Sequence, residues 1–183
     1  MGANLGTTTT AWIIAILGFK LELSSIALPI VGVGVVVSFC KRPGWRSSGE
    51  LLVGLGLLLM GLDYLKSSVP DLDPDSPALM WLRHYSNMGF LSVLLFLAFG
   101  VVLTIIVQAS SVAVAITITM AARGWIDFDL AAAIVLGENI GTTITANFAA
   151  ITANLAAKRA AMAHLIFNVL GVIWVLCVFY FFL

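Results

Sequence analysis

Apolar runs of nearly membrane-spanning length, separated by short polar clusters, constrain this chain more than any other feature. A helix that crosses a bilayer needs roughly 20 mostly apolar residues, and fewer if it is broken or re-entrant. With 61% hydrophobic and 10% charged residues, the chain lacks the polar surface of a water-soluble domain. We therefore predict an all-α integral membrane protein. The apolar runs cover residues 8–19, 26–40, 51–65, 88–122, 130–155 and 160–183.

Two of the longest runs contain polar clusters at which we expect broken helices. Gln108-Ala109-Ser110-Ser111 interrupts the run 88–122, which is too long for one untilted crossing. Residues 137–143, rich in glycine and threonine, interrupt the run 130–155. Irregular backbone inside a membrane is tolerated only where protein or a water-filled cavity satisfies its polar groups. Each break therefore marks a candidate functional site.

The distribution of polar and basic residues predicts the domain organisation. Residues 67–84 are the most polar stretch, and their prolines and aspartates predict an exposed loop. We predict a multi-pass protein of the cell (inner) membrane. The basic residues at 41–46 and 158–159 favour a cytoplasmic position for the two loops that contain them. We predict three segments: residues 1–66 as a partial first repeat, 67–87 as an extramembrane loop, and 88–183 as a second repeat.

A ten-residue motif occurs twice in the chain. Motif copy 1 is residues 2–11, GANLGTTTTA, and motif copy 2 is residues 137–146, GENIGTTITA. The flanking basic loops predict that the two copies have opposite orientations in the membrane. Inverted repeats with broken helices are the architecture of many secondary transporters, whose sites lie near the bilayer midplane where the repeats meet.

Each motif copy combines residue types suited to binding ions. Glycines permit a non-helical turn, and the threonines after them can cap a new helix whose free N–H groups attract an anion. Asparagine side chains and freed carbonyls offer oxygens to a small cation such as sodium. The alternative is that the glycines pack helices while the threonine hydroxyls bond to their own turn. The agreement of two copies favours ion binding.

Charged and polar groups other than the motif threonines indicate which ions the chain could bind. The cluster at 108–111 offers amide and hydroxyl groups, which either bind ions or hold helices together. Glu138 is a carboxylate within an apolar run, where it is either a sodium or proton ligand or a loop-tip residue nearer water. We expect His164 to pack between helices. No basic residue lies in the apolar runs beside these motifs, so a bound anion must be held by hydroxyls, amides, helix N-termini and any co-bound cations, and binding of the two ions would be coupled. This pattern predicts cotransport.

Other function classes lack the residues that they need. No nucleophile and base pair, paired carboxylates or metal-ligand cluster can be assembled from the sequence, so we do not expect an enzyme or a cofactor. The formal net charge is zero, which argues against a nucleic-acid partner. The expected partners are ions and the lipid bilayer.

Three elements together resemble the bacterial members of the type II sodium–phosphate cotransporters. They are the 108–111 cluster, the doubled Gly-x-Asn-[Leu/Ile]-Gly-Thr-Thr, and the segment KRAAMAHLIFN at residues 158–168. The resemblance covers nearly the whole chain. It implies inverted repeats with re-entrant helical hairpins and alternating access, with sodium and inorganic phosphate bound together at a midplane site.

The resemblance also implies site residues. Phosphate-binding residues are Gln108, Ser110, Ser111, Thr142, Thr143, Thr7 and Thr8, and sodium-binding residues are Asn4, Asn139, Gln108, Ser110, Thr9 and Glu138. Ala109 departs from the Gln-Ser-Ser-Ser element of the family. The family places another Gln-Ser-Ser element before its first motif, so we expect a missing N-terminal segment or a homo-oligomer to complete the site. The alternative is a non-transporting membrane scaffold or an incomplete transporter fragment.

Overall fold

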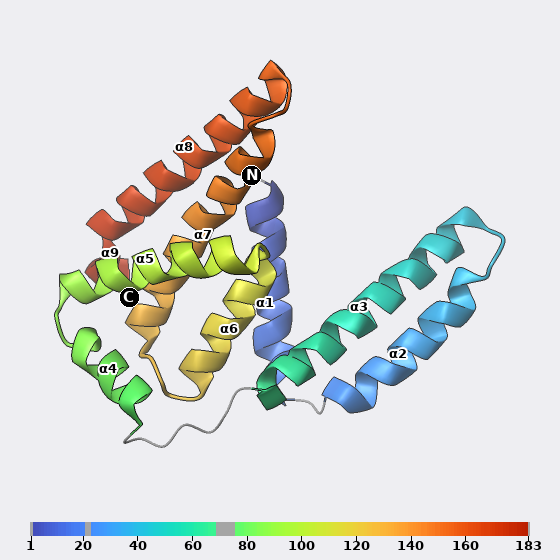
Figure 1. Cartoon of the computed structure of the whole chain (residues 1–183). Helices are drawn as coiled ribbons and strands as arrows, with labels where there is room; N and C mark the ends of the chain where they lie inside the picture. Colours follow the sequence, from blue (N-terminus) through green and yellow to red (C-terminus); the bar gives the residue numbers. More distant parts are fainter. Residues whose placement is uncertain (1, 21–22, 69–75, 183) are drawn as a thin grey trace. The chain divides into compact units, whose positions relative to one another are not determined.

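A computed structural model describes residues 2–20, 23–68 and 76–182, and every element in those ranges is a helix (Figure 1). The all-α prediction is confirmed for this part of the chain. The elements are α1 (Gly2–Lys20), α2 (Leu23–Ser38), α3 (Pro43–Ser68), α4 (Pro77–Ser86), α5 (Phe90–Val107), α6 (Ser110–Ala122), α7 (Phe128–Ala150), α8 (Leu155–Cys177) and α9 (Phe179–Phe182).

The helices form two compact units, each of which is described by itself. The first unit contains Met1–Thr8 together with Leu72–Leu183, and the second contains Thr9–Asp71. The boundary falls inside α1, so the first two turns of that helix belong with α4 to α9. The predicted segments 1–66, 67–87 and 88–183 describe repeats rather than compact units, and they stay predictions.

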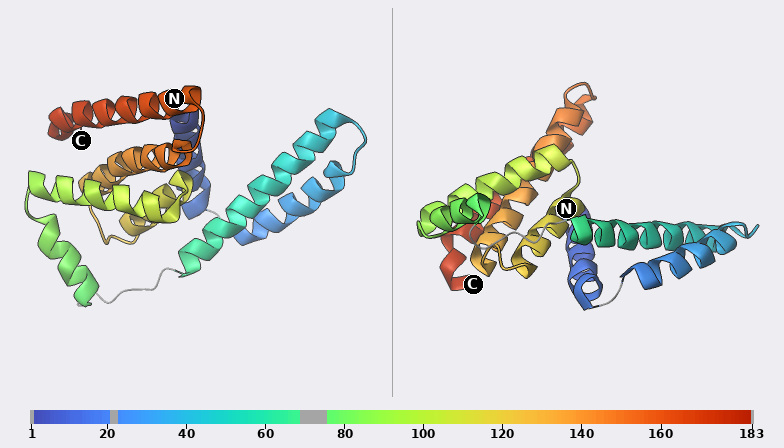
Figure 2. Two further views of the ribbon diagram at one scale, coloured as in Figure 1. Left: turned by 45° about the horizontal axis from the view of Figure 1, so that its top comes forward. Right: turned by 60° about the horizontal axis from the view of Figure 1, so that its bottom comes forward.

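In the second unit, α2 and α3 pack closely as a helical hairpin (Figures 1 and 2). A Cβ atom added to Gly34 would lie 2.8 Å from the backbone nitrogen of Val53. One added to Gly56 would lie 3.0 Å from the carbonyl oxygen of Ala27. Glycines at these positions allow the two backbones to approach each other, as small residues do in membrane helix pairs.

In the first unit, α7 is the central helix, because α5, α6 and α8 all pack against it. An apolar core joins α5, the first half of α7 and α9. Motif copy 2 begins just after these core residues, near the middle of α7. The core therefore fixes the position of α7 and contains none of the residues of copy 2. The buried core residues are Val93, Phe96, Ile126, Leu130, Ala131, Ala133, Ile134 and Phe179.

Within residues 2–20, 23–68 and 76–182, two helices, α5 and α8, are long and apolar enough to cross a membrane. Two shorter apolar helices cover Ser25–Ser38 and Ser110–Ala122. Only 28% of the apolar stretch of α5 and 11% of that of α8 is buried within the protein. Long apolar helices that stay mostly exposed are characteristic of a membrane or partner interface rather than of a monomer in water. The arrangement supports the predicted membrane location.

The structure confirms one predicted break and contradicts the other. The backbone leaves the helix at residues 108–109, between α5 and α6. At residues 137–143 it does not, because α7 is continuous from Phe128 to Ala150. Motif copy 1 likewise lies within the continuous helix α1. The predicted non-helical turn is wrong for both copies, since glycine permits a turn but does not require one.

The predicted loop at 67–84 is also wrong in part. Pro77–Ser86 forms the helix α4, while α3 extends to Ser68. Proline is favoured in the first turn of a helix, where its missing N–H group has no intrahelical partner to lose. Pro77 therefore marks the start of a helix and not a loop.

Candidate functional site

The break between α5 and α6 places polar groups at a chain reversal. Gln108 has φ 56° and ψ 18°, the left-handed conformation, and its N–H group donates to the carbonyl oxygen of Thr104 at 2.8 Å. Ala109 is extended, with φ −144° and ψ 105°. Few non-glycine residues adopt positive φ, and such residues concentrate at functional sites. The side chain of Gln108 is exposed at this break.

The first turn of α6 combines free backbone donors with hydroxyl groups. Ala109 occupies the N-cap position without a side-chain hydrogen bond, although its carbonyl oxygen accepts from the N–H groups of Val112 and Ala113. The hydroxyl oxygens of Ser110 and Thr7 lie 3.1 Å apart and share a hydrogen bond. Because Thr7 belongs to motif copy 1, this contact joins copy 1 to the polar cluster at 108–111. An uncapped helix N-terminus of this kind attracts anions.

An amide network joins the two motif copies through α8. Asn168 is 4% exposed, and its Oδ1 accepts a hydrogen bond from the Nδ2 of Asn4 at 2.7 Å. The Nδ2 of Asn168 donates to the carbonyl oxygen of Asn139, also at 2.7 Å. His164, one turn earlier on α8, places its Nε2 atom 3.4 Å from the Oδ1 of Asn4. The asparagines of the two copies are thus connected by one buried side chain.

The glycines of motif copy 2 pack α7 against α5. A Cβ atom on Gly137 would overlap the carbonyl oxygen of Leu97, and one on Gly141 would lie 2.8 Å from the carbonyl oxygen of Val101. Gly100 of α5 has the reciprocal position against Ile134. These are the close backbone contacts of a small-xxx-small helix pair. Gly137 and Gly141 therefore serve to pack α7 against α5, as the helix-packing interpretation of the motif predicts.

The threonines of the motifs do not cap new helices. The hydroxyl of Thr142 donates to the carbonyl oxygen of Glu138 at 2.8 Å, and that of Thr143 donates to Ile140 at 2.6 Å. In copy 1, the hydroxyl of Thr8 donates to the carbonyl oxygen of Asn4 at 2.9 Å. Threonines inside a continuous helix bond to the preceding turn in this way. The predicted capping role is therefore wrong, and the uncapped N-terminus next to the copy 1 residues is that of α6.

Glu138 lies on a different side of α7 from the amide network. It is 1% exposed, and its Oε1 accepts a hydrogen bond from the hydroxyl of Thr117 on α6 at 2.7 Å. Its Oε2 is buried and has no hydrogen-bond partner in the described part of the protein. The expectation that Glu138 lies deep in an apolar region is consistent with this burial, whereas the loop-tip alternative is wrong.

The predicted site residues divide into groups that the structure brings together and groups that it does not. In the first unit, Asn4 and Asn139 are connected through Asn168, and Thr7 is bonded separately to Ser110, with Ser111 following in the same turn of α6. Thr9 is exposed and belongs to the second unit, so it is not grouped with the residues of the first unit.

Two residues of the network are absent from the predicted site residues. Asn168 and His164 are four residues apart on an apolar helix, and His164 was assigned a packing role only. A signal was available, because polar side chains at this spacing share one face of a helix and seldom face lipid. Their contacts with Asn4 place them in the candidate site.

Comparison with known proteins places these features in a family. The sequence profile described as Na+/Pi-cotransporter matches residues 1–67 and 80–180. The uncharacterized protein YqeW of Bacillus subtilis (strain 168) is 34% identical over 179 residues, which are 96% of this chain and 54% of that protein. YjbB of Escherichia coli (strain K12), named for inorganic phosphate export, is 31% identical over 173 residues, 93% of this chain and 30% of that protein.

A human protein is also similar. Sodium-dependent phosphate transport protein 2C of Homo sapiens is 34% identical over 140 residues, which are 69% of this chain and 22% of that protein. The chain thus spans about half the length of YqeW and less than a third of the other two relatives. No solved structure matches the chain significantly. The match of the family profile over most of the sequence shows that this chain belongs to the Na+/Pi-cotransporter family.

Proposed function

We propose that this chain takes part in sodium-coupled transport of inorganic phosphate across the cell membrane. The family match and the names of the relatives support the choice of phosphate and sodium. The observation that carries the proposal is the bridge from Asn4 through Asn168 to Asn139, with Thr7 bonded to Ser110 one turn further along α1. The bridge joins both motif copies, and the separate bond from Thr7 joins copy 1 to the start of α6.

In this proposal, phosphate binds at the N-terminus of α6. The free N–H groups of the first turn and the positive end of the helix dipole favour a negatively charged ligand. The hydroxyls of Ser110, Ser111 and Thr7, together with the amide of Gln108, supply further hydrogen-bond donors. The roles predicted for Thr8, Thr142 and Thr143 in phosphate binding stay predictions, since their hydroxyls are bonded to their own helices.

Sodium binds next to phosphate and compensates its charge. Helices α5, α6 and α7 contain no lysine, arginine or histidine, so these helices offer no cationic side chain to the anion. Oxygen atoms of Asn4, Asn139, Gln108 and Ser110 are suited to a small hard cation. Each ion then raises the affinity for the other by thermodynamic linkage. The sodium roles predicted for Thr9 and Glu138 stay predictions.

Transport by alternating access requires contacts that can change. The glycine contact between α5 and α7 is made by tightly apposed backbones, whereas the first turns of α1 are joined to α6 and α8 by side-chain hydrogen bonds. We expect movement at the side-chain contacts and rigidity at the glycine contact. The inverted repeat, the inner-membrane location with several crossings, and the second copy or N-terminal segment completing the site stay predictions.

Isothermal titration calorimetry on the purified protein tests this proposal. Phosphate is titrated in sodium buffer and in potassium buffer, and we expect at least tenfold tighter binding in sodium. Ser110→Ala should weaken phosphate binding, because it removes a hydroxyl from the proposed site. Ser48→Ala is the matched control, since the exposed hydroxyl of Ser48 donates only to Gly44 in its own helix α3.

Two results would overturn the proposal. One is phosphate binding of equal strength in sodium and potassium, and the other is no phosphate binding by a folded protein. Uptake of radioactive phosphate into vesicles containing the protein, with sodium replaced by potassium, then measures transport itself. A protein whose polar network only holds helices together would lose stability in Ser110→Ala without any change in phosphate binding.

A further inference from the structure

Glu138 is a buried acid that the proposed ion site does not use. Motif copy 1 has Ala3 at the equivalent position, so the carboxyl group distinguishes copy 2. Its Oε1 accepts a hydrogen bond from the Thr117 hydroxyl, and its Oε2 has no partner among the described residues. A buried carboxylate with one hydrogen bond and no counterion is costly in its ionised form.

The helices around Glu138 provide no counterion. Neither α5 nor α6, which both pack against α7, contains an ionisable side chain. On α8, Lys158 and Arg159 are exposed in the first turns, and His164 contacts Asn4. On α7 itself the other ionisable group is Asp129, which is exposed in the first turn. The charge of Glu138 must therefore be neutralised by something that binds to it.

The surroundings of Glu138 fit a proton better than a metal cation. A sodium ion needs several oxygen ligands, whereas among the described residues the carboxyl group of Glu138 has one hydrogen-bond partner, the Thr117 hydroxyl, which donates to Oε1. On one flank, Gly137 and Gly141 are pressed against the backbone of α5, leaving no space for an ion.

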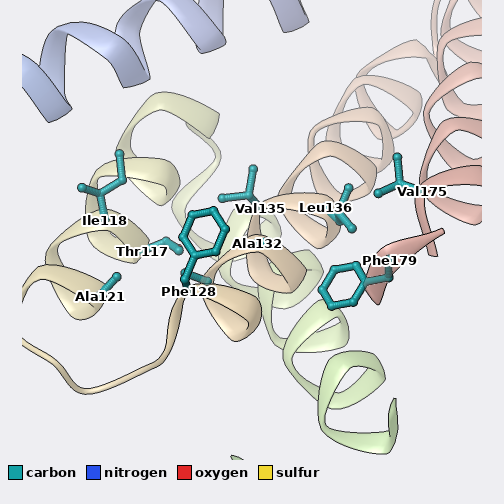
Figure 3. A pocket seen from close by; sticks show the side chains of 10 residues that line it. Thr117, Ile118, Ala121, Phe128, Ala132, Val135, Leu136, Val175 and Phe179 are labelled. Carbon is teal, nitrogen blue, oxygen red and sulfur yellow. The ribbon is translucent and has the colours of Figure 1, made fainter. Parts of the chain in front are cut away.

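An apolar cavity borders Thr117. Thr117 lines this pocket of about 600 Å³ together with apolar side chains of α6, α7, α8 and α9 (Figure 3). Ala131 and Val135 line it from α7, and the helical spacing of three and four residues places Glu138 on the same face, one turn further. The cavity therefore adds no oxygen ligands for a cation near Glu138.

We infer that Glu138 and Thr117 form a proton-binding site between α6 and α7, with the proton on Oε2. An O–H bond forms at Oε2 when a proton arrives from water, and the same bond breaks when the proton returns to water. The packing of α6 on α7 seen here is then the protonated conformer. Ionisation favours a rearrangement that hydrates the carboxylate, so pH controls the packing of these two helices.

Carboxyl NMR of the whole chain tests this inference directly. The chain has three glutamates, Glu22, Glu50 and Glu138, so Glu22→Gln with Glu50→Gln leaves one glutamate side-chain carboxyl carbon to label selectively with 13C. An exposed glutamate ionises around pH 4.3, so it is almost fully ionised at about pH 6. We expect the Glu138 resonance to keep the chemical shift of a carboxylic acid at about pH 6 in sodium-free buffer.

The matched control keeps Glu50 as the labelled residue, with Glu22→Gln and Glu138→Gln. Glu50 is exposed and paired with Arg46, so its resonance supplies the reference chemical shift with which that of Glu138 is compared. If the double variants do not fold, the wild-type chain with all three glutamates labelled should still show one carboxylic acid resonance at that pH. That resonance should disappear in the single variant Glu138→Gln.

A carboxylate shift for Glu138 at about pH 6 would overturn the inference. Replacing potassium by sodium supplies a second decisive arm, because conversion of the acid resonance to a carboxylate by sodium would identify a cation site instead. No phosphate is present in either arm. Failure of the proton site is therefore distinguishable from failure of the proposed phosphate transport, which the calorimetry measures.

Discussion

Motif copies 1 and 2 share most of their residues, yet their glycines have different surroundings. Gly137 and Gly141 lie against the backbone of α5, where a side chain would overlap Leu97 or crowd Val101. At Gly2 and Gly6, a Cβ atom would meet nothing within 4 Å. The same residue type is therefore required by packing in copy 2, whereas no described contact requires it in copy 1.

The asparagines and threonines of the two copies also differ in their contacts. Asn4 uses its side chain to bond to Asn168, while the equivalent Asn139 contributes its backbone carbonyl. Thr7 bonds across to Ser110, while the equivalent Thr142 bonds to its own helix. At these two positions, copy 1 bonds to other helices through its side chains, whereas copy 2 uses a backbone carbonyl or bonds to its own helix. A repeated motif specifies residue types, and the neighbouring helices decide which atoms are used.

The largest expected effect comes from adding a methyl group to the glycines of each copy. Gly137→Ala should destabilise the protein by about 1–3 kcal/mol, because the backbone of α5 cannot move away cheaply. Gly6→Ala should stabilise it by about 0.5–1 kcal/mol, because alanine is the better helix residue and has open space there. Thermal and denaturant unfolding in detergent measure both changes.

Equal effects of the two glycine substitutions would contradict the contrast between the copies. Gly54→Ala serves as a control, since a Cβ at Gly54 in α3 also meets nothing within 4 Å. It should behave like Gly6→Ala. A destabilising Gly6→Ala would show that the glycines of copy 1 also lie at a tight contact.

A loss of stability similar to that of Gly137→Ala, without a stabilising counterpart in the other copy, is expected at the amide bridge between the copies. Asn168→Ala removes two hydrogen bonds and should cost about 1–3 kcal/mol, because the amide of Asn4 loses its partner. Asn147→Ala is the matched control: the Nδ2 of Asn147 also joins α7 to α8, donating to Ala161, but has no contact with copy 1 in the described structure. Both should lower stability, as measured by unfolding in detergent, and only Asn168→Ala should abolish sodium-dependent phosphate binding.

Loss of phosphate binding in both asparagine variants would indicate that helix packing alone is responsible. Retention of binding in a folded Asn168→Ala variant would remove the bridge from the site. Asn168→Gln adds a finer test, since it keeps the amide but displaces it by one methylene group. We expect it to bind phosphate more weakly than the wild type while unfolding at a temperature between those of the wild type and Asn168→Ala.

The smallest expected effect is the coupling between Thr7 and Ser110. A double-mutant cycle with Thr7→Val and Ser110→Ala should give a coupling energy of about 0.5–1.5 kcal/mol, the net contribution of one hydrogen bond. The same cycle with Thr142→Val in place of Thr7→Val should give a coupling near zero, because Thr142 bonds to its own helix. Similar coupling in both cycles would mean that the copies contact Ser110 in the same way.

Much of the fold and part of the site could be predicted from residue patterns. Apolar run lengths predict the helices, and the polar cluster at Gln108 correctly predicts the break between α5 and α6. The match between the copies predicts that Asn4 and Asn139 belong to one region, and Asn168 forms hydrogen bonds with both of them. The continuous helix at Gly137 was not predictable, because a glycine that permits a turn and one that permits close packing look the same in a sequence. Asn168 carried a signal in its spacing from His164.

The sequence by itself determined that this chain is helical, apolar enough for a membrane, and a member of a cotransporter family. The tertiary structure decided that the motif of copy 2 is a packing surface and that one buried amide, Asn168, joins the copies. It also decided that, among the described residues, the carboxyl group of Glu138 has a hydrogen bond only from Thr117. Apolar length and residue type are local properties, whereas the role of a glycine, amide or carboxyl group depends on which atoms of other helices lie within contact distance.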